Sequence, residues 1–508
     1  MLRSISFFTD NQTLVMAQST QLLIGGNGKQ TVLMDASMAN RHGMIAGATG
    51  TGKTITLQIL AENFSQAGVP VFLADVKGDV SAIGKPAKSH KKIDERIEKI
   101  GIDNYQMQAS PVVFWDLFGK KGHPIRTTVS EIGPLLLSNL LDLNDTQTGI
   151  LYSCFKIADD EGLLILDLKD LRTMLIWMGD NRAELKSEYG NISTASIGAI
   201  QRGLLVLEEQ GADFLLGEPA IELDDLMGLD FSGRGIINIL DASNLIQKSP
   251  KLYATFLLWL LSELFETLPE VGDAEKPKFV MFFDEAHLLF DDAPKVLIDK
   301  IEQVVRLIRS KGVGIYFISQ SPLDVPEEIL GQLGLKIQHA LRAFTPKDQK
   351  AVKTVANTFR ANPDIDTGKV ITELGVGEAL VSTLDKKGIP TQVEQILIRP
   401  PESQIGPMTK TQRKELMSRS PYRGRYDKSL DRDSAYEMLT QRAEKAAKAA
   451  ALIEEKETVS RSSSSKRRTS SRSKRQSTAE ALLKSTARSI GSQLGRRLVR
   501  GILGSLFK

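Results

Sequence analysis

Residues 45–60 read IAGATGTGKTITLQIL, and this stretch constrains the fold more than any other part of the chain. Gly47, four further residues, and then Gly52, Lys53 and Thr54 fit the P-loop pattern. Glycines let the backbone curl so that consecutive N–H groups point at phosphate oxygens, and the following helix adds its positive N-terminal end. An apolar strand candidate (HGMIAG) precedes the loop and a helix candidate (TITLQILAENF) follows it, which is the context that a P-loop requires.

The P-loop predicts a nucleoside triphosphate, ATP, bound with Mg²⁺. Lys53 is expected to reach the β- and γ-phosphates, and the Thr54 hydroxyl is expected to ligate the metal. The residues predicted to contact the nucleotide are Gly47, Thr49, Gly50, Thr51, Gly52, Lys53, Thr54 and Ile55.

A second phosphate-site signal is FVMFFDEAH at 279–287, an apolar run that ends in Asp284 and Glu285. These two carboxylates are called the Walker B pair. A buried strand of this kind delivers its last carboxylate to the magnesium, so Asp284 is a predicted metal ligand through a water. Glu285 is placed to orient and deprotonate an attacking water, as a hydrolase requires. The alternative is that the acidic pair merely caps a helix. His287 completes a superficial DEAH box, and we interpret it as incidental.

Three further residues follow this segment. Gln320 ends the strand candidate GIYFISQS and is predicted to sense the γ-phosphate; the alternative is an amide that faces a turn. Arg306 and Arg309 are three residues apart in the helix candidate 294–312, and therefore on one face. Arginines near a helix end are usually surface residues, but their position makes them candidates for an arginine finger that reaches a neighbouring subunit's nucleotide.

The rest of the chain predicts an α/β fold. Near-continuous apolar strands favour a mostly parallel sheet covered by helices on both faces, as in RecA-like P-loop NTPases. The strand candidates are 71–75, 112–117, 235–243, 279–285 and 314–321, and later ones at 337–344, 377–384 and 391–398 extend the sheet. Helical periodicity between about 127 and 230 predicts an inserted helical subdomain.

These patterns divide the chain into seven segments. They are a short N-terminal β segment (1–40), the P-loop half of the ATPase core (41–126), the helical insertion (127–234), the Walker B half of the core (235–400), a linker and charged helix (401–458), a disordered Ser/Arg/Lys-rich linker (459–477) and a basic amphipathic helix (478–508).

Five motifs in this order make the chain similar to one family: GATGTGKT, LADVKGD, FFDEAH, RSKGVGIYFISQ and LRAFTPKDQKAV. The chain resembles the HerA/FtsK superfamily of ring-forming motor ATPases, in particular the HerA-like branch typified by the bacterial YjgR proteins. The resemblance covers nearly the whole chain. It implies that Lys53 and Thr54 belong to Walker A and that Gln320 is the γ-phosphate sensor. It also implies that Arg309 is the trans-acting finger, with Arg342 as a second arginine at the subunit boundary.

The resemblance further implies a hexameric ring that translocates double-stranded DNA through a central channel, with a nuclease or other protein as a partner. One departure concerns the ring. Archaeal HerA proteins carry a β-barrel before the P-loop that helps to close it, and about 46 residues precede Gly47 here. Support for DNA from the residues is a basic stretch with Lys85, Lys88, Lys91 and Lys92, for which a solvated loop is the alternative.

Charge is distributed unevenly. The formal net charge is +3, yet residues 459–508 carry 13 Lys and Arg against the single acidic residue Glu480, so the rest of the chain is mildly acidic. The basic tail suggests an anionic partner, and its apolar residues at helical spacing beside Arg496, Arg497 and Arg500 suit an interfacial helix on anionic lipid. The alternatives are a helix that docks in a partner's groove, packing onto the protein's own body, and a solvated tail.

The tail motivates a second functional hypothesis, a P-loop ATPase that acts on proteins or at a membrane surface, as in secretion or conjugation. The single cysteine, Cys154, lies in an apolar stretch and fits a reducing compartment. The most apolar window, 252–265, is shorter than the ~20 residues that span a bilayer. The N-terminus lacks the apolar core of a signal peptide. The sequence therefore predicts a cytoplasmic protein with peripheral membrane contact through its tail as an option.

Overall fold

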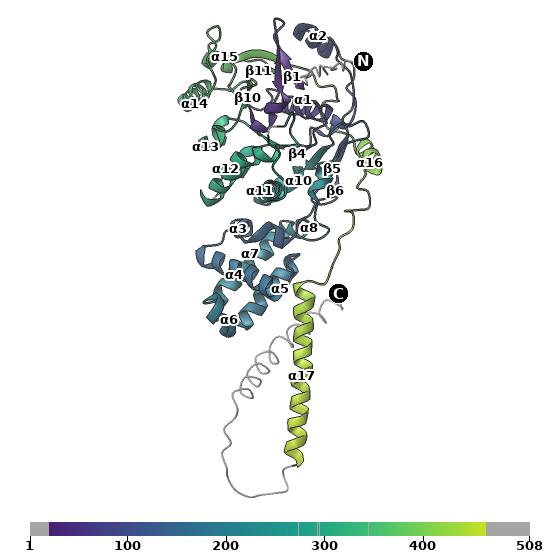
Figure 1. Cartoon of the computed structure of the whole chain (residues 1–508), viewed down its shortest axis with the longest axis vertical. Coiled ribbons are helices and arrows are strands. Elements are labelled where there is room, and N and C mark those ends of the chain that lie inside the picture. The colour runs from purple at the N-terminus through teal and green to yellow at the C-terminus, as the bar shows by residue number, and fades with distance from the viewer. Residues whose placement is uncertain (1–19, 273, 292, 294, 344, 464–508) are drawn as a thin grey trace, which may run out of the picture. The chain divides into compact units, whose positions relative to one another are not determined.

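A computed structural model of the chain describes residues 20–272, 274–291, 293, 295–343 and 345–463 (Figure 1). The chain divides into two compact units, which are described separately. Among the described residues, unit 1 consists of 20–113, 223–240 and 262–416, and unit 2 consists of 114–222, 241–261 and 417–463. The basic helix predicted over 478–508 lies outside the described residues, as does part of the predicted N-terminal β segment (1–19) and most of the predicted linker (464–477).

The two units differ from the predicted domain boundaries. Residues 114–126 and 241–261, predicted to be parts of the ATPase core, are grouped with the helical unit 2. One contact joins these two segments within unit 2, since Lys121 Nζ donates to Asp241 Oδ1 at 3.1 Å. The segment 223–234, predicted to belong to the insertion, is part of unit 1 because it leads directly into one of the sheet strands.

Unit 1 is built on a sheet in which the strands hydrogen-bond in the order β2-β1-β12-β11-β10-β3-β9-β8-β4-β7. The strands are β1 (Gln21–Gly26), β2 (Thr31–Asp35), β3 (Gly43–Ala46), β4 (Val71–Asp75), β7 (Ile237–Asp241), β8 (Phe279–Phe283), β9 (Val313–Ser319), β10 (Leu335–Gln338), β11 (Glu378–Ser382) and β12 (Glu394–Ile398). From β10 to β4 the neighbours run parallel, and β11, β12, β1 and β2 extend the sheet in antiparallel pairs. All residues of β3, β4, β8 and β9 are buried, as parallel strands between helical layers must be. The predicted α/β fold with a parallel core and a later extension is confirmed.

The strand predicted over 337–344 is wrong beyond its second residue, because β10 ends at Gln338. The next residue, His339, is buried and leaves the strand to serve the P-loop helix. Its ring bonds to Thr56 Oγ1 (2.8 Å) and to the carbonyl oxygen of Glu378 (2.9 Å). A pattern of apolar residues cannot distinguish a buried imidazole that supports a loop from a residue that continues a strand.

The helices of unit 1 lie between these strands. They are η1 (Ala36–Arg41), α1 (Lys53–Gln66), η2 (Ser81–Gly84), α2 (Lys91–Ile100), α9 (Leu223–Leu226), η3 (Ala286–Leu289), α12 (Lys295–Ile308), η4 (Arg309–Lys311), η5 (Pro322–Asp324), α13 (Glu327–Leu330), α14 (Pro346–Ala356), α15 (Thr367–Glu373) and most of α16 (Lys410–Ser418). The helix after the P-loop, α1, is almost wholly buried and packs on β1, β3 and β4. It therefore ties the loop to the centre of the sheet.

Unit 2 is mainly helical. Its helices are α3 (Val129–Leu140), α4 (Asp145–Glu161), α5 (Leu168–Asp180), α6 (Arg182–Tyr189), α7 (Thr194–Glu209), α8 (Ala212–Leu215), α10 (Ser243–Lys248), most of α11 (Pro250–Thr267) and α17 (Ala435–Ser463), and α3 to α7 form one group in Figure 1. Capping boxes begin α3, α4 and α5, which is the local reason why these helices start where they do. β5 (Val112–Asp116), whose last three residues belong to this unit, pairs in parallel with β6 (His123–Pro124).

The helix α17 runs to Ser463 and so enters the segment 459–477 that was predicted to be disordered. An alanine-rich stretch (443–451) lies in the middle of this helix, and once a helix is nucleated each added residue costs little, so it extends past the predicted boundary. Two other expectations concern unit 2. The Cys154 thiol is buried, and burial raises its pKa to about 12, in keeping with packing rather than reactivity. The apolar window 252–265 lies within α11, and no helix in the described ranges is long and apolar enough to cross a bilayer.

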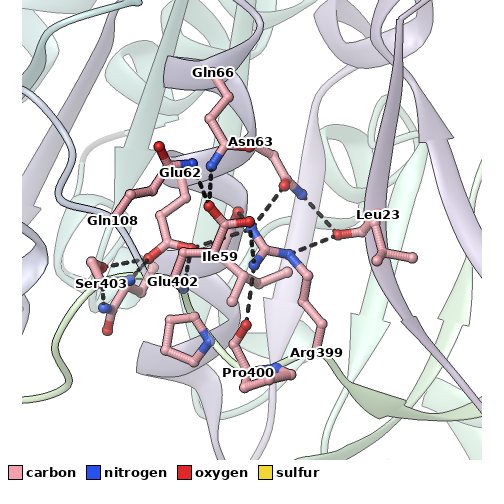
Figure 2. Close-up of polar contacts among 12 residues, drawn as sticks. Leu23, Ile59, Glu62, Asn63, Gln66, Gln108, Arg399, Pro400, Glu402 and Ser403 are labelled. Atoms are coloured by element: carbon pink, nitrogen blue, oxygen red, sulfur yellow. Dashed lines mark hydrogen bonds and ion pairs between the residues drawn. The ribbon is translucent and has the colours of Figure 1, made fainter. Parts of the chain in front are cut away.

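A buried polar network fastens α1 to the chain that follows β12 (Figure 2). The Arg399 guanidinium donates to Glu62 Oε2 (3.2 Å), Asn63 Oδ1 (2.9 Å) and the Leu23 carbonyl (3.3 Å). The Glu62 carboxylate also accepts from the backbone N–H of Ser403 at 2.9 Å. Burial raises the pKa of Glu62, and the charge of Arg399 opposes that rise. The P-loop helix is thus held at its far end by an ion pair away from water.

We expect Arg399→Met to destabilise unit 1 by about 3–5 kcal/mol, because it leaves the Glu62 carboxylate buried without its cation. Denaturation followed by circular dichroism, together with hydrogen exchange of the α1 amides, measures the effect. Lys85→Met is the matched control, since it breaks the more exposed ion pair with Glu415 (3.4 Å) and is expected to cost less than about 1 kcal/mol. Equal shifts for the two variants would contradict the assigned role of Arg399.

Candidate nucleotide site

The P-loop curls between β3 and α1 through glycines that adopt backbone angles closed to other residues. Gly47, Gly50 and Gly52 have φ of 153°, 80° and 121°. At Gly47 a Cβ would also lie 2.5 Å from His339 Cβ, so no larger residue fits. At Gly50 the same added atom would meet nothing within 4 Å, so the space beside this residue is open. This cradle has the form that a chain of phosphates requires.

Lys53 is buried within this loop. Its ammonium group donates to the carbonyl oxygens of Gly47 (2.5 Å) and Ala48 (3.2 Å). Burial first, and then the positive charge of Lys77, lower the pKa of Lys53, while the charges of Glu285 and Asp284 raise it. The Walker B pair is therefore close enough to Lys53 to raise the pKa of its ammonium group.

The Walker B pair follows the buried strand β8, which lies between β4 and β9 in the sheet. Burial, and next the charge of Glu285, raise the pKa of Asp284 to about 7. Two adjacent carboxylates in a poorly solvated site favour the binding of a cation, which can then bridge them to a phosphate. Together with the Thr54 hydroxyl, Asp284 is the kind of donor set that holds Mg²⁺ with few protein ligands, so the residues present fit MgATP.

Glu285 has an unusual backbone conformation, the left-handed one (φ 49°, ψ 52°), which is uncommon for a residue with a side chain. Its Oε1 lies 3.0 Å from Lys77 Nζ. Its Oε2 is buried and has no hydrogen-bond donor among the described residues, with His287 Nδ1 at 3.5 Å. An available acceptor oxygen on a strained backbone is typical of a functional residue.

Residues 20–508 of the chain match the family described as "Helicase HerA-like C-terminal". The chain belongs to this family. Among curated proteins it is similar to the DNA double-strand break repair helicases HerA of Sulfolobus acidocaldarius (23% identical over 370 residues) and Sulfurisphaera tokodaii (22% identical over 370 residues). Each match covers 71% of this chain and 65% of the relative, so the chain spans less than two thirds of the relatives' length.

Among solved structures, the chain is similar to the plasmid coupling protein TrwB in complex with the non-hydrolysable GTP analogue GDPNP. The TM-score is 0.51 at 14% identity, over 76% of this chain and 92% of that chain. This likeness concerns the fold, and it confirms the predicted RecA-like P-loop architecture. The predicted membership of the HerA/FtsK-type P-loop ATPases is confirmed by the family match, and ATP and Mg²⁺ are the cofactors of that class.

In this HerA-like chain Gln320 is exposed and comes directly after β9. The preceding carbonyl, that of Ser319, accepts from the Gly47 N–H at 3.3 Å, so the end of β9 touches the start of the P-loop. The position agrees with a γ-phosphate sensor in space, and the role stays a prediction.

Arg309 lies near the N-terminal ends of the parallel strands, whereas the P-loop follows the C-terminal end of β3. Arg309 opens η4, just before β9, and β9 then runs seven residues (roughly 23 Å) to Ser319 beside Gly47. The Arg309 side chain is exposed and lines a cleft shared with Arg306, which itself pairs with Glu302 at 3.5 Å. Arg309 therefore cannot serve the nucleotide of its own chain. Arg342 is exposed in a separate cleft, beside α14 and α15.

Sequence reasoning missed the residues of the turn after β4. Asp75 Oδ1 accepts from the N–H groups of Gly78 (2.7 Å) and Asp79 (3.2 Å), and the resulting turn carries Lys77 to Glu285. The Thr54 hydroxyl lies 3.4 Å from Asp79 Oδ2. His287, interpreted as incidental, also lies beside Glu285. The available signal was a cluster of charged residues directly after a buried strand, but it becomes informative only once β4 is known to neighbour β8.

Proposed function

We propose that this chain hydrolyses ATP with Lys53, Asp284 and Glu285 as its central residues. The observation that carries the proposal is that β3, which leads into the P-loop, and β8, which leads into the Walker B pair, both run parallel to β9, so the two segments follow the same ends of the strands. The charges of Asp284 and Glu285 also act on Lys53. Bound Mg²⁺ supplies charge neutralisation at the phosphates. Lys53 binds the β- and γ-phosphates, Thr54 and Asp284 hold the metal, Glu285 accepts the proton of the attacking water, and Gln320 contacts the γ-phosphate.

The remaining predicted contacts belong to the same cradle. In the proposed complex Thr49, Gly50 and Thr51 turn backbone N–H groups toward the phosphates. Ile55 lies in the first turn of α1, and the N-terminal end of this helix adds its positive dipole. This arrangement orients the triphosphate through the main chain, and it leaves the chemistry to the side chains of Walker A and Walker B.

We further propose that the active form is a homo-oligomer, a hexameric ring, in which Arg309 of one subunit acts on the nucleotide of the next. The support is the position of Arg309, exposed and at the opposite edge of the sheet from the P-loop of its own chain. An arginine so placed can stabilise phosphoryl charge only in a second subunit. Arg342, also exposed, is a secondary candidate for the same boundary.

The proposed work of the ring is translocation along double-stranded DNA in the cytoplasm, with a nuclease or another protein as a partner. The support is the family, and the curated relatives that are described as DNA double-strand break repair helicases. Lys91 and Lys92 begin α2 and are exposed, as a phosphate-tracking surface requires. The alternative is an ATPase that acts on proteins or at a membrane surface, which the basic composition of 459–508 favours.

Duplex DNA is expected to raise ATP turnover several-fold, and the stimulation should fall steeply with salt because phosphate contacts release counterions. The double variant Lys91→Glu, Lys92→Glu should need more DNA for half-maximal stimulation. Lys386→Glu, Lys387→Glu, an equal change of charge at exposed residues between β11 and β12, is the control. Turnover that ignores DNA but rises with anionic vesicles would favour the alternative function.

A further inference from the structure

Lys77 lies in the turn that follows β4, next to the Walker B strand. β4 and β8 pair in parallel, with Leu73 opposite Phe282, so both strands deliver their following residues to the same edge of the sheet. Asp75 fixes the turn, because its carboxylate accepts from the N–H groups of Gly78 and Asp79. The backbone that carries Lys77 is therefore held in place, and only its long side chain can move between ion-pair partners.

The partner that it has in this structure is Glu285. Lys77 Nζ lies 3.0 Å from Glu285 Oε1, and this pair occupies one of the two oxygens of the proposed water-activating carboxylate. Glu285 is nearly buried, whereas the Lys77 side chain is 40% exposed. The ammonium group can therefore leave the pair without being drawn out of the protein interior, while the carboxylate stays where it is.

A second destination for this ammonium group lies close by. Thr54 Oγ1 is 3.4 Å from Asp79 Oδ2, which places the turn against the first residues of the P-loop helix. The positive charge of Lys77 also lowers the pKa of Lys53, the residue expected to bind the β- and γ-phosphates. A terminal phosphate carries more negative charge than a carboxylate, and it accepts charge-assisted hydrogen bonds from ammonium groups. It would compete with Glu285 for Lys77.

We propose that Lys77 is a positioning residue that changes its partner from Glu285 to the γ-phosphate, and so couples triphosphate binding to the release of Glu285. The pair that Lys77 makes with Glu285 keeps one carboxylate oxygen away from water. Lys77 moves to the γ-phosphate when ATP is bound, and both Glu285 oxygens then face the attacking water. The inference rests on the proposed ATP hydrolysis, and it adds that the water-activating residue is released only by a triphosphate and not by a diphosphate.

The first test compares ATP and ADP affinities of the full chain, measured by fluorescence competition in the presence of Mg²⁺. Lys77→Met is expected to weaken ATP binding about tenfold to a hundredfold and to change ADP binding less than twofold, because only ATP carries the γ-phosphate. Lys77→Arg keeps the positive charge and is expected to restore most of the ATP affinity. Thermal unfolding of both variants, expected near the wild-type value, checks that the fold is intact.

The second test asks whether Glu285 and the γ-phosphate compete for Lys77. Glu285→Gln removes the ion pair, so ATP should bind more tightly than in the wild type while ADP affinity stays the same. Adding Lys77→Met to Glu285→Gln should abolish that gain. A gain that persists in the double variant would show that the lost carboxylate charge alone is responsible, and it would overturn the proposal.

The inference and the proposed function can fail separately. A wild-type protein that binds ATP but shows no turnover, with or without DNA, overturns the proposed hydrolysis. Equal losses of ATP and ADP affinity in Lys77→Met, or no loss of either, overturn the role of Lys77 whether or not the wild type hydrolyses ATP.

Discussion

Replacing Glu285 by glutamine should lower ATP turnover by about 10²- to 10⁴-fold, the range that a general base contributes. The amide keeps the size of the side chain but cannot accept the proton of the attacking water. Glu285 follows Asp284 in a left-handed backbone conformation, and its buried Oε2 has no hydrogen-bond donor among the described residues. Phosphate release under saturating ATP measures the loss, and nucleotide binding measured beside it should remain.

Two variants make that result specific. Lys53→Ala should lose binding and turnover together, because it removes the ammonium group at the centre of the cradle. His287→Ala changes a side chain 3.5 Å from the same carboxylate and should lower turnover far less than Glu285→Gln does. A Glu285→Gln enzyme with wild-type turnover would contradict the assignment of the water-activating residue.

Much of the fold was predictable because the parallel core is buried on both faces. An apolar run such as 71–75 or 279–283 has no polar face, and it could only be a covered strand or a buried helix; its length and the turn residues after it favour a strand. The P-loop was predictable for a different reason. Its glycines and Lys53 are close together in sequence, so one short stretch of the chain carries the whole pattern.

The parts that were missed depend on which strands are neighbours. Lys77 meets Glu285 only because β4 lies beside β8, and the sequence separates these two strands by about 200 residues. The end of β10 was misjudged because His339 supports the P-loop helix through a hydrogen bond to Thr56, a tertiary contact with no local signature. The division into two compact units also differs from the predicted boundaries, since residues 241–261 are grouped with the helical unit 2.

Arg309 shows how the two kinds of information combine. The sequence placed it after Walker B and, by resemblance, made it a finger that acts on a neighbouring subunit. The structure adds a physical reason, because a seven-residue strand separates it from the P-loop edge of its own chain. An arginine at that position can contribute to ATP hydrolysis only at the nucleotide of a neighbouring subunit. Such a role in trans can be tested by mixing subunits.

Arg309→Ala should lower the turnover of the assembled protein by about 10³-fold or more, the effect typical of removing an arginine finger. Lys53→Ala should be inactive by itself for lack of nucleotide binding. A mixture of the two variants should regain activity, because subunits with an intact P-loop then receive Arg309 from Lys53→Ala neighbours. Phosphate release across mixing ratios measures this, with a maximum expected at intermediate ratios.

Arg306→Ala is the matched control, since Arg306 is exposed, lies three residues earlier on the same side and pairs with Glu302 of its own helix. Its partner is already supplied within the chain, so its loss should change turnover less than about threefold, the effect of a surface ion pair. If the mixture of Arg309→Ala and Lys53→Ala stays inactive while both variants still assemble, Arg309 does not act between subunits. Its exposed position at the far edge of the sheet would then be that of an ordinary surface arginine, and the ring would need another residue to stabilise the phosphoryl charge.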